Sequence, residues 1–406
     1  MKNKNFVIVV IGQIISLFGN AIQRFCMSLY ILDLTGSAKT FSIILAISNI
    51  PYILFAPIAG LLADTINRKK IMVYLDFLSS VLMAGYSIII ISGKDSSIII
   101  AVVMFILSTI YTLYSPSVTS CIPQIVEREK LATANAIIQQ VGYIVNLAGP
   151  IIAGLLYGFV GMKMIVVINA ISFFISAILE LLLDIPDLGV KEKLNNPLLK
   201  SVKEMKKSFV YLKNKKKIVL GIIFSYALTN IFVVPVLSVV SPYFINVKLD
   251  MPSSIYGYVE GVFVLGMIIG ATLITLNPNL FIMKKLHKTM YPMVAALLIM
   301  GISTYLSIQN KFIILGLYSI GGFGIMLSLA LSNIISLTYI QQEISEEMLG
   351  KVSAFSTAVA TASVVPGQIM YGQLIELNLS IFNILILTFI FSIGVVNFIK
   401  WNVRKI

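Results

Sequence analysis

Residues Gly60 to Lys70 read GLLADTINRKK, a short and basic link between two long apolar segments. Asp64 comes where the first apolar segment ends, and Arg68 and Lys69 come just before the second one begins. Lysine and arginine accumulate in the cytoplasmic loops between transmembrane helices. The stretch therefore predicts two spanning helices whose link lies in the cytoplasm.

The composition extends this prediction to the whole chain. Of the 406 residues, 58% are hydrophobic and 12% are charged, and the mean hydropathy is +0.97. Soluble domains average about 45–50% apolar and about 25% charged residues. A spanning helix needs about 20 apolar residues, and the apolar segments predict twelve of them, the first a transmembrane helix and not a signal peptide. They cover 6–32, 38–63, 71–92, 97–121, 131–160, 162–184, 218–246, 254–276, 288–308, 311–340, 350–376 and 380–400.

One long hydrophilic segment, 185–217, divides the twelve helices six and six and carries ten lysines. Within it, Leu198–Leu212 predicts an amphipathic helix on the membrane surface. We expect an N-terminal bundle over 1–184, a cytoplasmic linker over 185–217 and a C-terminal bundle over 218–406. The predicted fold is an all-α membrane protein with two six-helix bundles related by a pseudo-two-fold axis, the layout of alternating-access transporters.

The charges set the predicted orientation. The net charge is +13, and 24 of the 30 basic residues fall in segments that are cytoplasmic if the N-terminus is inside. Five fall in outer loops, and Arg24 falls within a helix. This bias follows the positive-inside rule. It predicts a multi-pass protein of the cell membrane with both termini cytoplasmic, and it explains the charge without nucleic acid.

Several classes of chemistry are excluded by residue counts. One histidine, His287, and two cysteines, Cys26 and Cys121, cannot build a His/Cys metal centre or a disulfide framework. They also cannot supply a Ser/His/Asp or Cys/His site, and no Walker-type loop is present. We expect no metal, no cofactor, no direct use of ATP and no enzymatic activity.

The link Gly60–Lys70 resembles the motif G-x-L-A-D-R-x-G-R-K of the major facilitator superfamily, at the same place between helices two and three. It departs from the motif at Thr65 and Asn67. The resemblance implies a gating role for Gly60, Asp64, Arg68 and Lys69. Ordinary positive-inside charge placement is the alternative explanation.

A second segment, Gly149-Pro150-Ile151-Ile152-Ala153-Gly154, resembles the G-P-x-x-G-G antiporter motif of exporters in that superfamily. The resemblance implies export through the roles of Gly149, Pro150 and Gly154, whereas close packing of membrane helices is the alternative. A broader likeness to the macrolide-efflux and siderophore-export branch rests on Gly12–Ser16, Leu34–Ala38, Asp76 and Leu131–Asn135. The segment 97–121 has no arginine, unlike many proton–drug antiporters.

Polar residues in the predicted helices define a candidate substrate cavity. Gln13, Ser16, Asn20, Gln23 and Arg24 share one face of the first helix, so they must face other helices or water. Tyrosines and asparagines of other helices complete the set. The candidate cavity residues are Asn20, Gln23, Arg24, Tyr111, Tyr114, Tyr226, Asn230 and Asn333, and helix packing is the alternative for each.

An ionisable residue inside the membrane is a functional-site hypothesis by default. Glu260 lies about 9 Å inside the eighth predicted helix, by about 1.5 Å per residue. We expect it to couple transport to protons, paired with Arg24 when the outer side is closed; a purely structural pair is the alternative. Asp76 and Glu180 lie near cytoplasmic helix ends and are expected to be interfacial anchors.

These features predict a monomeric secondary active exporter of amphipathic organic small molecules, with protons and the lipid bilayer as its other partners. An uptake symporter or a lysolipid flippase is the alternative within transport. A polytopic membrane enzyme is a remote alternative, because such enzymes need paired aspartates for metal–diphosphate or a His–Asp set.

Overall fold

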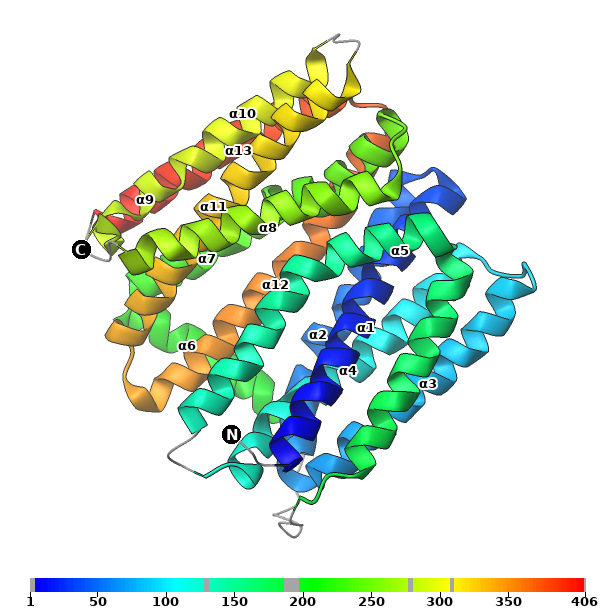
Figure 1. Cartoon of the computed structure of the whole chain (residues 1–406). Helices are drawn as coiled ribbons and strands as arrows, with labels where there is room; N and C mark the ends of the chain where they lie inside the picture. Colours follow the sequence, from blue (N-terminus) through cyan, green and yellow to red (C-terminus); the bar gives the residue numbers. More distant parts are fainter. Residues whose placement is uncertain (1–3, 128–130, 186–196, 277–279, 307–309, 405–406) are drawn as a thin grey trace. The chain divides into compact units, whose positions relative to one another are not determined.

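A computed structural model describes residues 4–127, 131–185, 197–276, 280–306 and 310–404 (Figure 1). These residues form helices and contain no strand, which confirms the predicted all-helical fold. Contacts divide the chain into two compact units. The first holds 1–35 and 47–201, and the second holds 36–46 and 202–406. The first residues of α2 therefore group with the second unit, although the rest of that helix groups with the first.

The first unit is built from five helical stretches in which α5 packs along both α1 and α3. Their bounds are α1 Lys4–Thr35, α2 Ala38–Thr65, α3 Arg68–Ile91, α4 Ser97–Ile125 and α5 Leu131–Leu181. The predicted segments agree with these bounds to within a few residues.

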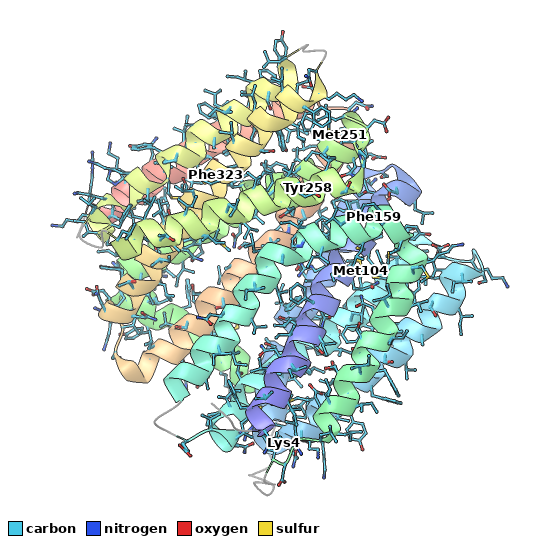
Figure 2. The ribbon with its side chains drawn as sticks, in the orientation of Figure 1. Lys4, Met104, Phe159, Met251, Tyr258 and Phe323 are labelled. Atoms are coloured by element: carbon cyan, nitrogen blue, oxygen red, sulfur yellow. The ribbon has the colours of Figure 1, made fainter. Side chains whose placement is uncertain are left out.

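Helix α5 is two crossings joined by a sharp turn at Gly161, whose φ of 71° and ψ of 169° are not helical. Its apolar part, Gln140–Leu181, has 42 residues. At about 1.5 Å per residue it would be roughly twice as long as a bilayer core is thick. The described residues hold eleven apolar stretches long enough to span a membrane. Dividing this one at Gly161 gives twelve, which confirms the predicted number. Phe159, beside the turn, is 83% exposed (Figure 2).

The second unit begins with an irregular helix. Helix α7 continues into two π-helical segments, η2 and η3, which follow Pro235 and Pro242. Proline lacks the N–H that an α-helical turn needs, so the winding widens there. The sequence predicted a single regular helix over 218–246 and missed this change. The bounds are α7 Lys217–Phe232, η2 Val236–Val240, η3 Tyr243–Lys248, α8 Ser253–Leu276, η5 Met283–Lys285, α9 Leu286–Thr289, α10 Tyr291–Tyr305, α11 Lys311–Glu343, α12 Glu346–Glu376 and α13 Ile381–Val403.

Large apolar side chains lie on the outer surfaces of both units. Tyr74, Ile88 and Ile98 of the first unit are at least 71% exposed, and Phe312 of the second is 67% exposed. Soluble proteins rarely expose so many apolar side chains, whereas lipid tails solvate them without cost. The outer surface is therefore suited to lipid.

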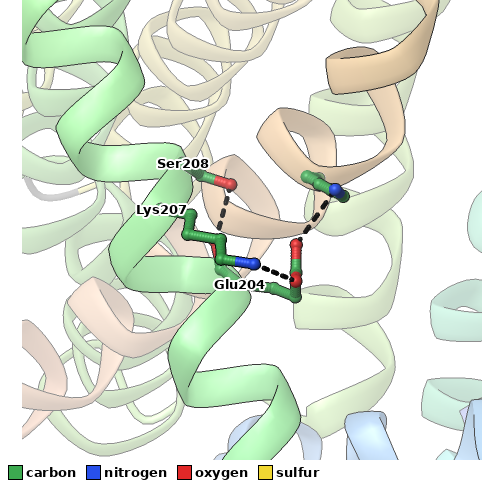
Figure 3. A network of polar contacts seen from close by, with 4 residues as sticks. Glu204, Lys207 and Ser208 are labelled. Carbon is green, nitrogen blue, oxygen red and sulfur yellow. Dashed lines mark hydrogen bonds and ion pairs between the residues drawn. The ribbon is translucent and has the colours of Figure 1, made fainter.

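The amphipathic linker helix α6, Pro197–Lys215, is docked on the second unit (Figure 3). Its Glu204 carboxylate lies 3.2 Å from the Lys351 ammonium on α12 and 3.2 Å from Lys207 on α6. Hydrogen bonds from Lys351 and then Lys207 hold the pKa of Glu204 below its usual range. The exposed ion pairs add little stability by themselves. Leu212 and Phe209 also pack into an apolar cluster with the second unit, where the Phe209 ring lies 6.2 Å from that of Phe355.

Glycines allow α8 and α11 to approach closely. A Cβ atom on Gly266 would overlap the backbone carbonyl of Phe323, and one on Gly270 would lie 2.7 Å from the carbonyl oxygen of Leu327. Phe323 is marked in Figure 2. Gly322 of α11 is in turn covered by the ring of Phe263. Small residues four apart are a common device for joining membrane helices, and here they set the distance between the two backbones.

Replacing Gly266 with alanine should destabilise the protein by about 1–3 kcal/mol, because the added methyl group overpacks a backbone contact. The measurement is the thermal midpoint of the purified protein in detergent. Gly316→Ala on α11 is the matched control, since a Cβ there meets nothing within 4 Å and alanine favours a helix over glycine by about 0.8–1 kcal/mol. A Gly266→Ala midpoint equal to that of the control would contradict the close approach.

Candidate functional site

The polar residues of α1 do not all face the same way. Gln23 is buried, and its side-chain oxygen accepts a hydrogen bond of 2.6 Å from Nδ2 of Asn169 on α5. The same Nδ2 atom donates to the Gly19 carbonyl at 3.1 Å. Gln23 thus joins α1 to α5 in this structure, and its role as a cavity residue stays a prediction.

Arg24, the next residue, is exposed and belongs to a different group. Its Nη2 atom donates to Oδ1 of Asn49 at 2.9 Å, and its guanidinium carbon lies 6.0 Å from the ring centre of Tyr52. The Tyr52 ring meets the half-buried Tyr111 ring edge-on at 6.0 Å. Arg24 and Tyr111 are therefore brought together by two α2 residues, Asn49 and Tyr52, which sequence reasoning missed. Their spacing of three residues on one helix face was the available signal.

Two other predicted cavity residues behave differently. Asn20 is half-buried, and its Nδ2 atom donates to the Ser16 carbonyl of its own helix at 2.8 Å. Tyr114 is only 4% exposed, and its hydroxyl donates to Oε1 of Glu180 at 2.6 Å. The Tyr114 hydroxyl is therefore used inside the bundle, and the role of Tyr114 in a cavity stays a prediction.

Asp76 and Glu180 are also not surface anchors. They are 2% and 0% exposed. Asp76 accepts a hydrogen bond of 2.6 Å from the Ser16 hydroxyl, and Glu180 accepts the one from Tyr114. The sequence placed both near helix ends, which is correct, but could not show that they point into the protein.

In the second unit the predicted cavity residues remain dispersed. Asn230 donates to the Ala360 carbonyl of α12 at 2.9 Å. Tyr226, one turn earlier on α7, has a buried hydroxyl. Asn333 is exposed on α11. Among the described residues, no hydrogen bond or ring contact joins these three side chains, and their role in a cavity stays a prediction.

Glu260 is half-buried on α8, where Tyr256 one turn before it donates to its Oε1 atom at 2.6 Å. Tyr256 itself is buried. A carboxylate on an apolar helix is thus held by one tyrosine hydroxyl, which fixes its orientation and leaves its second oxygen available to a proton.

The predicted gating residues are only partly described. Gly60 and Asp64 lie in the part of α2 whose side chains are outside the described residues. Arg68 and Lys69 are half-buried at the start of α3. Asn67 caps that helix, accepting from the Lys69 amide at 3.0 Å with a φ of −57°. Asn67 therefore acts as the N-cap of α3, and its backbone does not adopt the left-handed conformation that glycine would favour.

The segment that resembles an antiporter motif packs against α1. A Cβ on Gly149 would lie 3.2 Å from the Cβ of Ala21, whereas one on Gly142 would meet nothing within 4 Å. Gly154 is buried and Pro150 is half-buried. Gly149 therefore lets α5 approach the part of α1 that carries Gln23 and Arg24.

Comparison with known proteins identifies the family. The sequence profile described as Major Facilitator Superfamily matches residues 9–368. The chain belongs to this superfamily. It is accordingly a multi-pass membrane transporter and not an enzyme, as the two motif resemblances implied.

Individual relatives agree with this assignment. Macrolide efflux protein A of Streptococcus pyogenes is 25% identical over 370 residues, which cover 88% of this chain and 86% of the relative. The Enterococcus faecalis protein of that name is 24% identical over 343 residues, covering 82% and 99%. A nucleoside transporter structure superposes with a TM-score of 0.74 at 14% identity, covering 99% of this chain and all of that one. An inward-facing bacterial ferroportin homologue gives 0.70 at 17%, covering 100% and 99%. The structural likenesses establish the fold alone.

Arg24 and Gln23 make a direct test of which face of α1 meets water. Arg24→Cys should react readily with a charged, water-soluble thiol reagent, and Gln23→Cys should react far more slowly because Gln23 is 1% exposed. The measurement is the labelling rate in purified protein in lipid nanodiscs. The native cysteines, Cys26 and Cys121, are buried and provide a low background. Equal rates at the two positions would contradict the division of the helix face.

Proposed function

We propose that this transporter is a secondary active exporter of amphipathic organic molecules, driven by proton entry. The observation that carries the proposal is its similarity to macrolide efflux protein A across most of both chains. At this identity the name does not transfer the substrate by itself, so macrolides are the first compounds to test.

The group around Arg24 suits such a substrate. An exposed guanidinium has five N–H donors, and Asn49 uses one of them. The Tyr52 and Tyr111 rings beside it offer apolar surface and stacking. We propose that this group and the lining residues Asn20, Tyr226, Asn230 and Asn333 contact the substrate.

The direction of transport and its energy source are argued from two further features. Gly149 brings the motif-like segment against α1, and the resemblance of that segment to exporters favours efflux. Glu260 is a half-buried carboxylate whose one described hydrogen bond comes from Tyr256. We propose that it binds and releases the coupling proton. Its partnership with Arg24 stays a prediction.

We propose that the protein is a monomer in the plasma membrane. The orientation proposed from the charges places both termini, α6 and the Arg68–Lys70 link in the cytoplasm. In this orientation Asp64, Arg68 and Lys69 lie at the cytoplasmic ends of α2 and α3. A gate there would close the inner side of the transporter.

Glu260→Gln should abolish uphill export, because glutamine keeps the size of the side chain and cannot carry a proton. The measurement is accumulation of a radiolabelled macrolide in inside-out vesicles that hold a proton gradient, with and without a protonophore. Binding of the compound and exchange without a gradient should remain near the wild-type level.

The matched control is Glu376→Gln, which changes an exposed carboxylate at the end of α12. Accumulation by Glu260→Gln at the wild-type rate and pH dependence would rule out Glu260 as the coupling group. Accumulation in right-side-out vesicles instead would favour uptake over export.

The orientation predicts opposite labelling of two exposed lysine positions. In intact cells an impermeant thiol reagent should label Lys94→Cys, in the α3–α4 loop, and should label Lys213→Cys on α6 only after the membrane is permeabilised. Both side chains are exposed, so accessibility within the protein does not limit either reaction. Labelling of Lys213→Cys alone in intact cells would reverse the orientation.

A further inference from the structure

Five polar side chains form a closed cluster inside the first unit. Ser16 of α1 donates to Oδ2 of Asp76 on α3 at 2.6 Å, and its oxygen lies 3.1 Å from that of Ser176 on α5. Ser176 also donates to the Gly12 carbonyl of α1 at 3.3 Å. Glu180 follows Ser176 after one turn of α5. Tyr114 of α4 completes the cluster through its 2.6 Å bond to Glu180. Four crossing segments therefore converge on two carboxyl groups.

The two carboxyl groups have no positive partner in the described part of the chain. Both are buried, and Asp76 and Glu180 interact electrostatically with each other. The titratable groups facing them are Tyr114 and Cys121 of α4. Arg68, at the start of α3, interacts electrostatically with the Cys121 thiol but with neither carboxyl group. The basic residues of α1 are Arg24, eight residues after Ser16, and Lys4, twelve residues before it. Two negative charges placed so close without a cation would be very unfavourable.

The hydrogens of the cluster can be counted. Each hydroxyl has one hydrogen to donate. Ser16 gives its hydrogen to Asp76, and Tyr114 gives its hydrogen to Glu180 Oε1. Ser176 can give its hydrogen to the Gly12 carbonyl or to Asp76, and in neither case to Glu180. Oε2 of Glu180 is buried and receives no hydrogen bond from any described group. One oxygen of the pair thus lacks a hydrogen.

An apolar layer separates the cluster from the end of the first unit where α1 and α3 begin. Phe6 and Val9 precede Ser16 on α1, Met72 precedes Asp76 on α3, Ile122 follows Tyr114 on α4, and Leu183 follows Glu180. All five are at most 3% exposed and belong to one apolar cluster. The carboxyl groups are therefore sealed from the end of the first unit that carries the basic link Arg68–Lys70.

We propose that Asp76 and Glu180 together bind one proton, and that the transporter exchanges this proton with the cytoplasm when the apolar layer opens. The shared proton leaves one negative charge on the pair, and the Ser16 and Tyr114 hydroxyl groups donate to these two carboxyl groups. The exchange half of the proposal rests on the proposed proton-driven export; the binding half does not.

Infrared spectroscopy of the purified protein in nanodiscs tests the binding half. The wild type should show the C=O stretch of a protonated carboxylic acid at neutral pH. Asp76→Asn and Glu180→Gln should each remove it, because one proton shared by two groups is lost when either group becomes an amide. Glu376→Gln, which changes an exposed carboxylate, is the matched control and should leave this band in place.

Three results would overturn the shared proton. The first is the absence of the band from the wild type, a test that needs no variant to fold. The second is a band that persists in one of the two single variants, which would assign the proton to one residue alone. The third is thermal stabilisation by sodium in the wild type that is lost in Glu180→Gln, which would make the pair a metal-ion site.

Vesicle transport tests the exchange half. Glu180→Gln should lose uphill export and its pH dependence while keeping exchange without a gradient. Uphill export by Glu180→Gln with the wild-type pH profile would overturn the exchange. If wild-type export does not respond to a protonophore, the proposed function fails, and the infrared result still decides whether the pair holds a proton.

Discussion

A polar group inside a membrane helix has no water to bond with, so it must find a partner within the protein. This constraint organises the described contacts between helices. Gln23 and Asn169 satisfy each other between α1 and α5, and Asn230 reaches a backbone carbonyl of α12. In lipid such bonds replace much of the hydrophobic driving force that joins helices in water. They therefore fix the rotation of each helix about its axis as well as its neighbours.

Close contact between backbones is the second means of joining helices, and it depends on glycine. Gly266 and Gly270 let α8 meet the backbone of α11, and Gly149 lets α5 meet Ala21 of α1. In each case a larger side chain would push the helices apart. The two units use these contacts at different places: the first beside the Arg24 group, the second along the length of α8.

The sequence was sufficient to predict the twelve crossings, because hydropathy and charge depend on a residue's type and not on its neighbours. The linker helix could be predicted from the period of its apolar residues, which is also a property of the sequence alone. The roles of single polar residues could not. Gln23 and Arg24 are adjacent and both polar, yet Gln23 bonds to α5 and Arg24 bonds to α2. That difference depends on which helices surround α1, which no pattern within α1 specifies. The bond from Tyr114 to Glu180 could not be predicted for the same reason. The π-helical turns after Pro235 were missed because proline also permits a simple kink.

Ionisable groups inside a bilayer can be accommodated in two ways, and the first unit contains both. Arg24 cannot lose its proton. The N–H donors that Asn49 does not use require water or a polar ligand, and the exposure of the side chain makes both possible. Asp76 and Glu180 are dry, and a carboxyl group can remain dry only if its charge is removed or balanced. A shared proton removes one of the two charges, and the hydroxyl groups of Ser16 and Tyr114 donate to the pair that keeps the other. An arginine in a wet site recognises a ligand without changing its own charge, whereas a dry carboxyl pair changes its charge when water reaches it. The first arrangement suits substrate binding, and the second suits an ion whose binding must follow the opening and closing of the helices.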